Sequence, residues 1–231
     1  MENNQKFFQS IRFSENEELT HGFSTRIAGE ATTPEQAGDV IKGFGLKPGN
    51  LQLMRQVHKD GVVEIKELLP NRPEADSMIT NQPNIILGIR TADCVPLLIF
   101  DQENMAIAAV HAGWRSAAER LPIKTLKRMK ECFGTDPSRC QAVVGPAIGA
   151  CCYEVGKEVI GHFPSRFVQG ESHLDLPSAV IAQLEDMGVS RPQVFWVNEC
   201  TACNPSQFFS HRRDSGETGR HLSFITLRSQ K

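Results

Sequence analysis

Several features that define common protein classes are scarce in this chain of 231 residues. Lysine and arginine total 25 and aspartate and glutamate total 27, so the formal charge is only −2. That balance argues against binding to nucleic acid or to a membrane surface through bulk charge. The longest apolar runs, at residues 95–100 and 105–110, are far shorter than the roughly 20 residues of a membrane-spanning helix. We therefore expect neither nucleic-acid nor membrane partners.

We also expect no secretory leader, because residues 1–5 are polar and no apolar h-region follows them. The seven cysteines are an odd number, which argues against a closed disulfide framework. We expect a protein of the reducing cytoplasm, where cysteines serve as buried fillers, metal ligands or nucleophiles.

Familiar nucleotide and zinc signatures are missing too. The segment GPAIG at residues 145–149 follows a strand-like run, but it is neither a P-loop nor a dinucleotide fingerprint. The His-x-Glu and Pro-Cys-x-x-Cys elements of zinc deaminases are absent. These absences leave nucleotide binding through those folds, and deamination on that scaffold, without support.

What is present is a series of short apolar runs. Runs of strand length occupy residues 51–57, 62–65, 85–89, 95–100, 105–110, 141–144, 193–197 and 222–227. Several are apolar at successive positions, which is typical of strands covered on both faces. The first 50 residues are punctuated by glycines and predict loops.

Helices are predicted in the second half of the chain. One begins near Pro122, with apolar residues at helical spacing on one face, namely Ile123, Leu126, Met129 and Phe133. Two more are predicted at residues 156–163 and 177–187. No repeat or flexible linker interrupts the chain, so we predict a single domain over residues 1–231. Mixed strands and helices without a regular βαβ alternation favour a layered α/β sandwich over a barrel.

Three candidate metal ligands stand at predicted strand ends. His58 and His111 each follow a predicted strand, and Cys94 precedes one. A rigid sheet holds such positions while loops shape a pocket around them. Two imidazoles and one thiolate suit zinc, and three protein ligands leave the fourth tetrahedral position open, which is the catalytic pattern. The spacing is too wide for a short metal motif, so this hypothesis depends on the strand ends.

The same residues also permit a site without metal. Cys94 is a candidate nucleophile with His111 as its base, as in cysteine hydrolases. Asp93, beside Cys94, is a candidate either to orient a ligand histidine or to cap the turn. The sequence leaves both alternatives open.

Arginines are concentrated near these segments, namely Arg26, Arg55, Arg90, Arg115, Arg212, Arg213 and Arg220. Planar bidentate contacts from several arginines suit a small anion such as phosphate. The alternative for any one of them is surface solvation or pairing with a carboxylate.

Four other cysteines give weaker signals. Cys200 and Cys203 form a Cys-x-x-Cys pair, but a redox motif of the thioredoxin type belongs near the first strand and this pair lies close to the end. A structural zinc site needs a second, similarly spaced pair, and the adjacent Cys151 and Cys152 have no spacer. We therefore expect neither redox nor structural-zinc use of these residues.

Ten short blocks in a fixed order resemble the laccase-domain family, also called multicopper polyphenol oxidases. They are residues 21–26 (HGFSTR), 56–58 (QVH), 91–96 (TADCVP), 111–115 (HAGWR), 145–149 (GPAIG), 151–155 (CCYEV), 174–176 (LDL), 200–201 (CT), 208–214 (FFSHRRD) and 218–220 (TGR). Each block alone is weak, but together they are highly specific. Two departures are a short segment between Arg26 and Leu51 and Ser116 in place of a glycine.

The resemblance implies an α/β/β/α layered fold with mixed sheets. It also implies a zinc site at His58, Cys94 and His111, the residues reached above from strand ends. Despite the oxidase name, the family is similar to purine nucleoside phosphorylases that act on adenosine, guanosine and inosine. Adenosine deamination and methylthioadenosine phosphorolysis accompany that activity, and bacterial members are linked to peptidoglycan editing.

We therefore predict a zinc-dependent transferase that binds purine nucleosides and phosphate. Arg26, Arg55 and Arg213 are the predicted phosphate ligands, because they lie beside the family blocks. One rival is an amidase or hydrolase of peptidoglycan precursors that uses zinc or a Cys94–His111 dyad. The other is a copper-dependent polyphenol oxidase, which would need more histidines than the seven scattered here.

Overall fold

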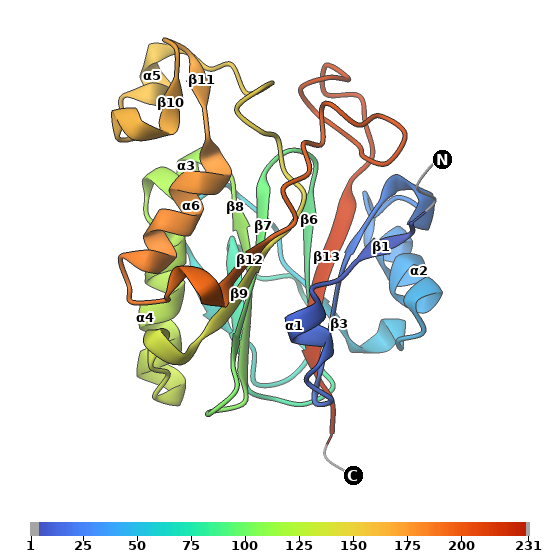
Figure 1. The fold of residues 1–231 in the computed structure, drawn as a ribbon. Coiled ribbons are helices and arrows are strands. Elements are labelled where there is room, and N and C mark those ends of the chain that lie inside the picture. Colours follow the sequence, from blue (N-terminus) through green and yellow to red (C-terminus); the bar gives the residue numbers. More distant parts are fainter. Residues whose placement is uncertain (1–4, 230–231) are drawn as a thin grey trace.

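A computed structural model describes residues 5–229 (Figure 1). Two large sheets dominate this part of the chain. In spatial order, the first contains β1 (Phe7–Phe8), β2 (Leu19–Ser24), β13 (His221–Leu227), β6 (Ile86–Thr91) and β3 (Leu51–Leu53). The second contains β12 (Val194–Trp196), β9 (Gln141–Val144), β7 (Val95–Asp101), β8 (Ala106–Ala112), β5 (Ser77–Thr80) and β4 (Val62–Glu64).

The other elements are helices, short turns and one small hairpin. The helices are α1 (Ile11–Ser14), α2 (Pro34–Phe44), α3 (Trp114–Ala118), α4 (Leu121–Phe133), α5 (Lys157–Ile160) and α6 (Leu176–Glu185). Single 3₁₀ turns occur at Arg26–Ala28, Pro48–Asn50, Pro137–Arg139, Ser165–Phe167 and Arg191–Gln193. The hairpin pairs β10 (Val168–Gln169) with β11 (His173–Leu174).

Strand β7 explains why the strand-like runs are apolar at every position. Side chains alternate between the two faces of a strand. Leu97 and Ile99 pack with the apolar faces of α4 and α6, whereas Leu98 and Phe100 pack against the other large sheet. All seven residues of β7 are buried. The prediction of strands covered on both faces is thereby confirmed.

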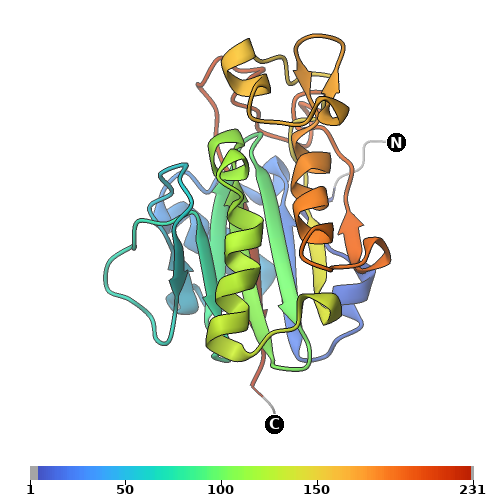
Figure 2. The same cartoon turned by 90° about the vertical axis from the view of Figure 1, so that its left-hand side faces the viewer.

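The layers follow from these packing faces. Helices α4 and α6 cover the outer face of the second sheet, as Figure 2 shows, and the two sheets share a core between them. On the outer face of the first sheet, α2 packs through Val40 and Ile41 against Leu222 and Phe224. The order of layers is α/β/β/α, as expected (Figure 1).

The prediction that the first 50 residues are mainly loop is wrong, because several glycines there serve packing and helix ends. Helix α2 starts at a capping box in which Thr33 Oγ1 accepts from the Gln36 amide at 3.3 Å. Gly45 follows the last helical residue, and its φ of 93° is the left-handed conformation that commonly ends a helix. Gly22 lies inside β2, where a Cβ would come within 2.8 Å of the Phe224 ring.

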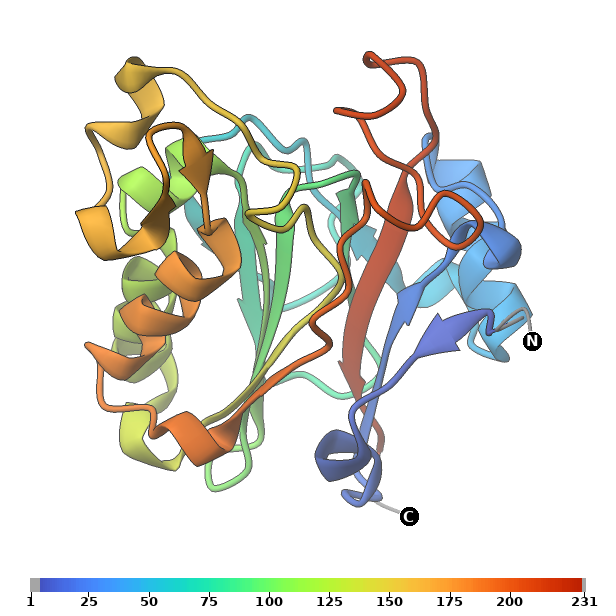
Figure 3. The same ribbon diagram turned by 45° about the horizontal axis from the view of Figure 1, so that its top comes forward.

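Two predicted boundaries also change. The strand predicted at residues 51–57 ends at Leu53, and His58 instead lies in a loop with φ of 57°. The helix predicted at 156–163 is limited to α5. The segment after β9 and the long loop that joins β12 to β13 gather at one end of the sandwich, drawn at the top of Figure 1 and turned forward in Figure 3.

Candidate metal centre

The three predicted ligands converge at that end of the sandwich. Strands β7 and β8 are antiparallel, so the start of one and the end of the other meet at the same edge, with Pro96 opposite His111. Cys94 immediately precedes β7 and lies beside His111. His58 approaches from its loop, and its ring centroid is 4.8 Å from that of His111. One ligand atom from each of the three residues lies within 4.8 Å of the others.

A buried carboxylate, Asp76, orients two of these ligands. Its Oδ1 lies 2.8 Å from His111 Nδ1 and 3.0 Å from the backbone nitrogen of His58. The Lys59 amide donates to Oδ2 at 2.7 Å. An ionised carboxylate only accepts hydrogen bonds, so His111 Nδ1 donates and Nε2 is left as the ligand atom. Asp76 therefore fixes both the tautomer of one imidazole and the loop that carries the other.

Asp76 was not found in the sequence. It precedes β5, which was not among the predicted strands, and no motif marks it. The available signal was an acidic residue two positions before the apolar pair formed by Met78 and Ile79. Asp93, the sequence candidate for orienting a histidine, instead accepts from Thr201 Oγ1 at 2.6 Å and from the Arg212 amide at 2.7 Å.

Electrostatics favour a thiolate at Cys94. Burial raises the pKa of Cys94, but the charge and hydrogen bonds of His111, aided by His58, lower it below its ordinary value. Burial lowers the pKa of His111, yet the thiolate and Asp76 raise it above its ordinary value. For Asp76 the hydrogen bonds outweigh burial and lower the pKa.

The backbone at Gly113 passes close to two of these donors. A Cβ at Gly113 would lie 3.1 Å from His58 Cδ2 and 3.3 Å from Cys94 Sγ. Glycine at this position therefore lets the chain pass behind the ligand atoms. Two imidazoles and one thiolate, with a buried carboxylate behind them, make a donor set that fits a divalent transition metal.

The three ligands open into a cavity of about 650 Å³. The residues that line it are Thr32, Gln56, His58, Arg90, Thr91, Ala92, Cys94, His111, His211, Gly216, Thr218 and Arg220. They come from both sheets and from the long loop before β13. A cavity of this size holds a small organic ligand, and most of the residues that line it carry polar side chains.

Two guanidinium groups belong to this lining. Arg90 donates to the Thr32 carbonyl at 2.5 Å, and its backbone is tied to Gln56 by hydrogen bonds of 2.7 and 2.8 Å. Burial lowers the pKa of Arg90, helped by the charges of Arg72 and Arg220. Arg220 donates to the carbonyls of Thr218 and Gly219 at 3.0 Å. Like charges that share one cavity repel each other, so an anion bound between them would relieve the repulsion.

The three arginines predicted to bind phosphate lie elsewhere and do not line the cavity. Arg26 donates to the Pro205 carbonyl at 2.5 Å and stacks on Phe209. Arg55 forms a surface ion pair with Glu74. Arg213 makes a bidentate pair with Asp214, at 2.7 and 2.8 Å. Their role in phosphate binding stays a prediction.

Sequence comparison places these observations in a family. A family model described as "Multi-copper polyphenol oxidoreductase laccase" matches residues 21–228. The chain belongs to this family. It is 35% identical over 205 residues to a protein of Clostridium acetobutylicum named "Purine nucleoside phosphorylase", covering 83% of this chain and 84% of the relative. A Deinococcus radiodurans protein of the same name is 33% identical over 234 residues, with 90% and 89% covered.

Structural comparison agrees on the fold. A crystal structure of the Bacillus licheniformis hypothetical protein YfiH is similar with a TM-score of 0.84 and 27% identity, covering 91% of this chain and 93% of that one. The family resemblance inferred from the ten sequence blocks is thereby confirmed. Separately, no helix between residues 5 and 229 combines the length and apolarity needed to cross a bilayer.

Proposed function

We propose that the protein is a zinc-dependent purine nucleoside phosphorylase. It would convert adenosine, guanosine or inosine and phosphate into the free base and ribose-1-phosphate. The supporting observation is that a thiolate, two imidazoles and two arginines share one cavity of about 650 Å³. The names of the relatives point the same way. Adenosine deamination and methylthioadenosine phosphorolysis are further proposed activities of this cavity, in a protein of the cytoplasm.

The donor set favours zinc over copper. His58, Cys94 and His111 would hold the ion and leave one tetrahedral position open. Blue-copper sites add a weak axial methionine. No methionine lines the cavity in the part of the chain that the structure describes. Zinc, when bound, supplies a Lewis acid that polarises an oxygen atom.

The remaining polar residues of the cavity would bind and orient the reactants. In phosphorolysis a phosphate oxygen bonds to ribose C1′, while the C1′–N9 bond breaks and its electron pair leaves with the purine. Arg90 and Arg220 would hold the phosphate, with Gln56 fixing the backbone of Arg90. His211 lines the cavity outside the metal ligands and would protonate the departing purine at N7.

A phosphorolysis assay tests the proposal directly. Purified, zinc-loaded protein is incubated with inosine, with and without phosphate, and hypoxanthine and ribose-1-phosphate are quantified. We expect both products, in equal amounts, only when phosphate is present. If zinc-loaded protein forms no ribose-1-phosphate from any of the three nucleosides, the proposal is wrong.

A second candidate is an amidase or hydrolase acting on peptidoglycan precursors. The observation that favours it is the thiolate–imidazolium character of Cys94 and His111, which also suits a nucleophile and its base. Replacing Cys94 by Ser separates the two cases when metal content is measured with activity. Loss of activity with zinc retained indicates a nucleophile, whereas loss of both activity and zinc indicates a ligand.

Stoichiometric copper with oxygen-dependent oxidation of phenols would instead indicate a polyphenol oxidase.

A further inference from the structure

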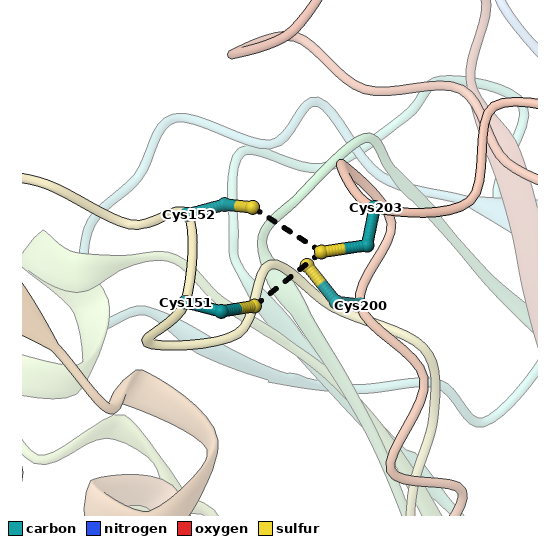
Figure 4. A group of neighbouring side chains, drawn as sticks. All are labelled: Cys151, Cys152, Cys200 and Cys203. Carbon is teal, nitrogen blue, oxygen red and sulfur yellow. Dashed lines mark hydrogen bonds between the residues drawn. The ribbon is translucent and has the colours of Figure 1, made fainter.

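A second set of possible metal ligands lies outside the cavity. Cys151, Cys152, Cys200 and Cys203 bring their sulfur atoms within 4.8 Å of one another. Cys203 Sγ is 3.5 Å from Cys151 Sγ and 3.3 Å from Cys152 Sγ, and all four side chains point toward a common centre (Figure 4). The sequence argument against a structural zinc site, that a matching pair is missing, is therefore wrong.

Parallel strands create this cluster. Strands β9 and β12 are parallel neighbours, so the loops that follow them leave the sheet at the same edge. Beyond the sheet the two segments stay paired through Ala147 and Cys200, and the Thr201 amide donates to the Ala147 carbonyl at 3.0 Å. The pair formed by Cys151 and Cys152 thus lies opposite the Cys-x-x-Cys pair.

We infer that the four cysteines bind a structural zinc ion. Zinc–sulfur bonds of about 2.3 Å place the sulfurs of a tetrahedral site about 3.8 Å apart. The measured separations of 3.3 and 3.5 Å approach that value and exceed the length of a disulfide bond, about 2.05 Å. An iron–sulfur cluster puts several atoms between its cysteine sulfurs and would need a wider arrangement. Four thiolates close the coordination sphere, as in structural sites.

A backbone hydrogen bond supports a thiolate in this cluster. The Gly149 amide lies 3.3 Å from Cys200 Sγ and donates to it. Such bonds from outside the coordination sphere stabilise the negative charge of a ligand and fix its direction. A Cβ at Gly149 would lie 3.3 Å from Cys151 Sγ, so this position also has to be small.

The zinc ion would fix one wall of the cavity. Thr201 lies between the two cysteines of the Cys-x-x-Cys pair, and its hydroxyl donates to Asp93, the neighbour of Cys94. Downstream of Cys203 the chain supplies His211, Gly216, Thr218 and Arg220 to the cavity. Zinc at the four cysteines therefore anchors the loop that carries these residues. The inference does not depend on which reaction the cavity performs.

Metal analysis of the full-length protein tests the inference. Protein purified under reducing conditions with zinc is expected to hold about two zinc ions per chain, one at each cluster. Cys203→Ser is expected to hold about one. Cys132→Ser is the matched control, because Cys132 is a half-buried thiol outside both clusters and contacts Glu64 at 3.4 Å. This control is expected to retain both ions.

Cobalt substitution provides a second measurement that does not need a folded variant. A tetrathiolate cobalt(II) site gives intense visible and sulfur-to-metal charge-transfer bands, and we expect them in the wild-type protein. Hydrogen exchange at residues 204–220 should be faster in Cys203→Ser than in Cys132→Ser. Three results would each overturn the inference: a zinc content that Cys203→Ser does not lower, iron at this site, or a disulfide between any two of these cysteines.

Discussion

The two sulfur-containing clusters of this molecule are built in opposite ways. In the cavity cluster, Cys94 and His111 stand at the ends of paired strands, and His111 and its partner Asp76 are buried. In the four-cysteine cluster every ligand comes from a loop, and Cys151 and Cys203 are exposed. One cluster offers three donors inside a cavity, and the other offers four donors outside it.

The difference shows how donor number and support match the role of a site. Three donors, two of them beside paired strands and the third in a loop held by Asp76, leave a position open for a reactant and keep the geometry fixed while it reacts. Four donors on loops leave no open position, so a bound ion would serve to hold the loops together. The contrast predicts that damage to the first cluster abolishes activity, whereas damage to the second reduces it.

The largest expected effect is at Cys94. Replacing Cys94 by Ala should lower kcat/KM for inosine by about 10³-fold, because it removes a ligand of the catalytic metal. Cys203→Ser should lower it by about tenfold or less, since it acts only through the cavity wall. Phosphorolysis rates with Cys132→Ala as control measure both. Equal losses in the two variants would remove the distinction between the clusters.

Asp76 should matter next. Asp76→Asn is expected to weaken zinc binding at the cavity cluster by about 10–100-fold, because the site loses the negative charge beside His111 and one of the two acceptor oxygens that hold His111 and the His58 loop. Competition with a chromogenic chelator measures this affinity. Asp101→Asn is the matched control, being a buried aspartate on β7 whose bonds go to residues 103 and 104. A normal affinity in Asp76→Asn would contradict the proposed role.

The arginines test which part of the molecule binds phosphate. We expect Arg90→Ala to raise KM for phosphate about 10–100-fold, because the variant loses a charge-assisted hydrogen bond to the bound phosphate. Arg55→Ala, which removes a surface ion pair, should change it less than about twofold. Initial rates at varied phosphate concentration decide between them. The opposite order would favour the arginines predicted from the sequence.

Thr201 joins the two clusters and should affect stability. Thr201→Val removes a hydrogen bond of 2.6 Å to the buried Asp93 and should lower the free energy of unfolding by about 2 kcal/mol. Thr226→Val is the control, because the hydroxyl of Thr226 makes only a 3.3 Å bond to the Leu227 carbonyl. Urea denaturation of both variants gives the difference. Equal stability would mean that Thr201 does not couple the clusters.

The smallest effect expected for a single side chain concerns two histidines outside both clusters. Burial lowers the pKa of His221 from 6.5 to about 3 and that of His21 to about 4. Each accepts a backbone hydrogen bond through Nε2, which requires the neutral ring. As the pH falls, these histidines therefore bind protons in the unfolded chain before they do so in the folded protein. Their contribution to the free energy of unfolding is complete well above pH 6.5 and decreases below it. We expect a loss of about 1.4 kcal/mol per histidine at pH 5.5. Denaturation at a series of pH values, with NMR titration of both rings, measures it, and a flat profile would contradict it.

Prediction from the sequence succeeded where short-range pattern and long-range structure agree. The runs at 95–100 and 105–110 correspond to β7 and β8, because strands covered on both faces are apolar throughout. The same runs placed Cys94 and His111 next to predicted strands, and the antiparallel pairing of β7 and β8 in the structure brings the two residues to one edge of the sheet. It failed in the first 50 residues, where Gly22 and Gly45 serve close packing and a helix end, which a local pattern does not distinguish from turns.

The sequence by itself determined the layered α/β class through its apolar runs and the family through its ten short blocks, and it led to the prediction of His58, Cys94 and His111 as metal ligands. Only the tertiary structure revealed the positions of Asp76 and Arg90 beside the cavity and the convergence of the four cysteines. Each depends on contacts between segments far apart in the chain, such as the parallel pairing of β9 and β12 that brings Cys151 to Cys203. Sequence spacing records local neighbours, whereas sheet register sets which distant residues meet.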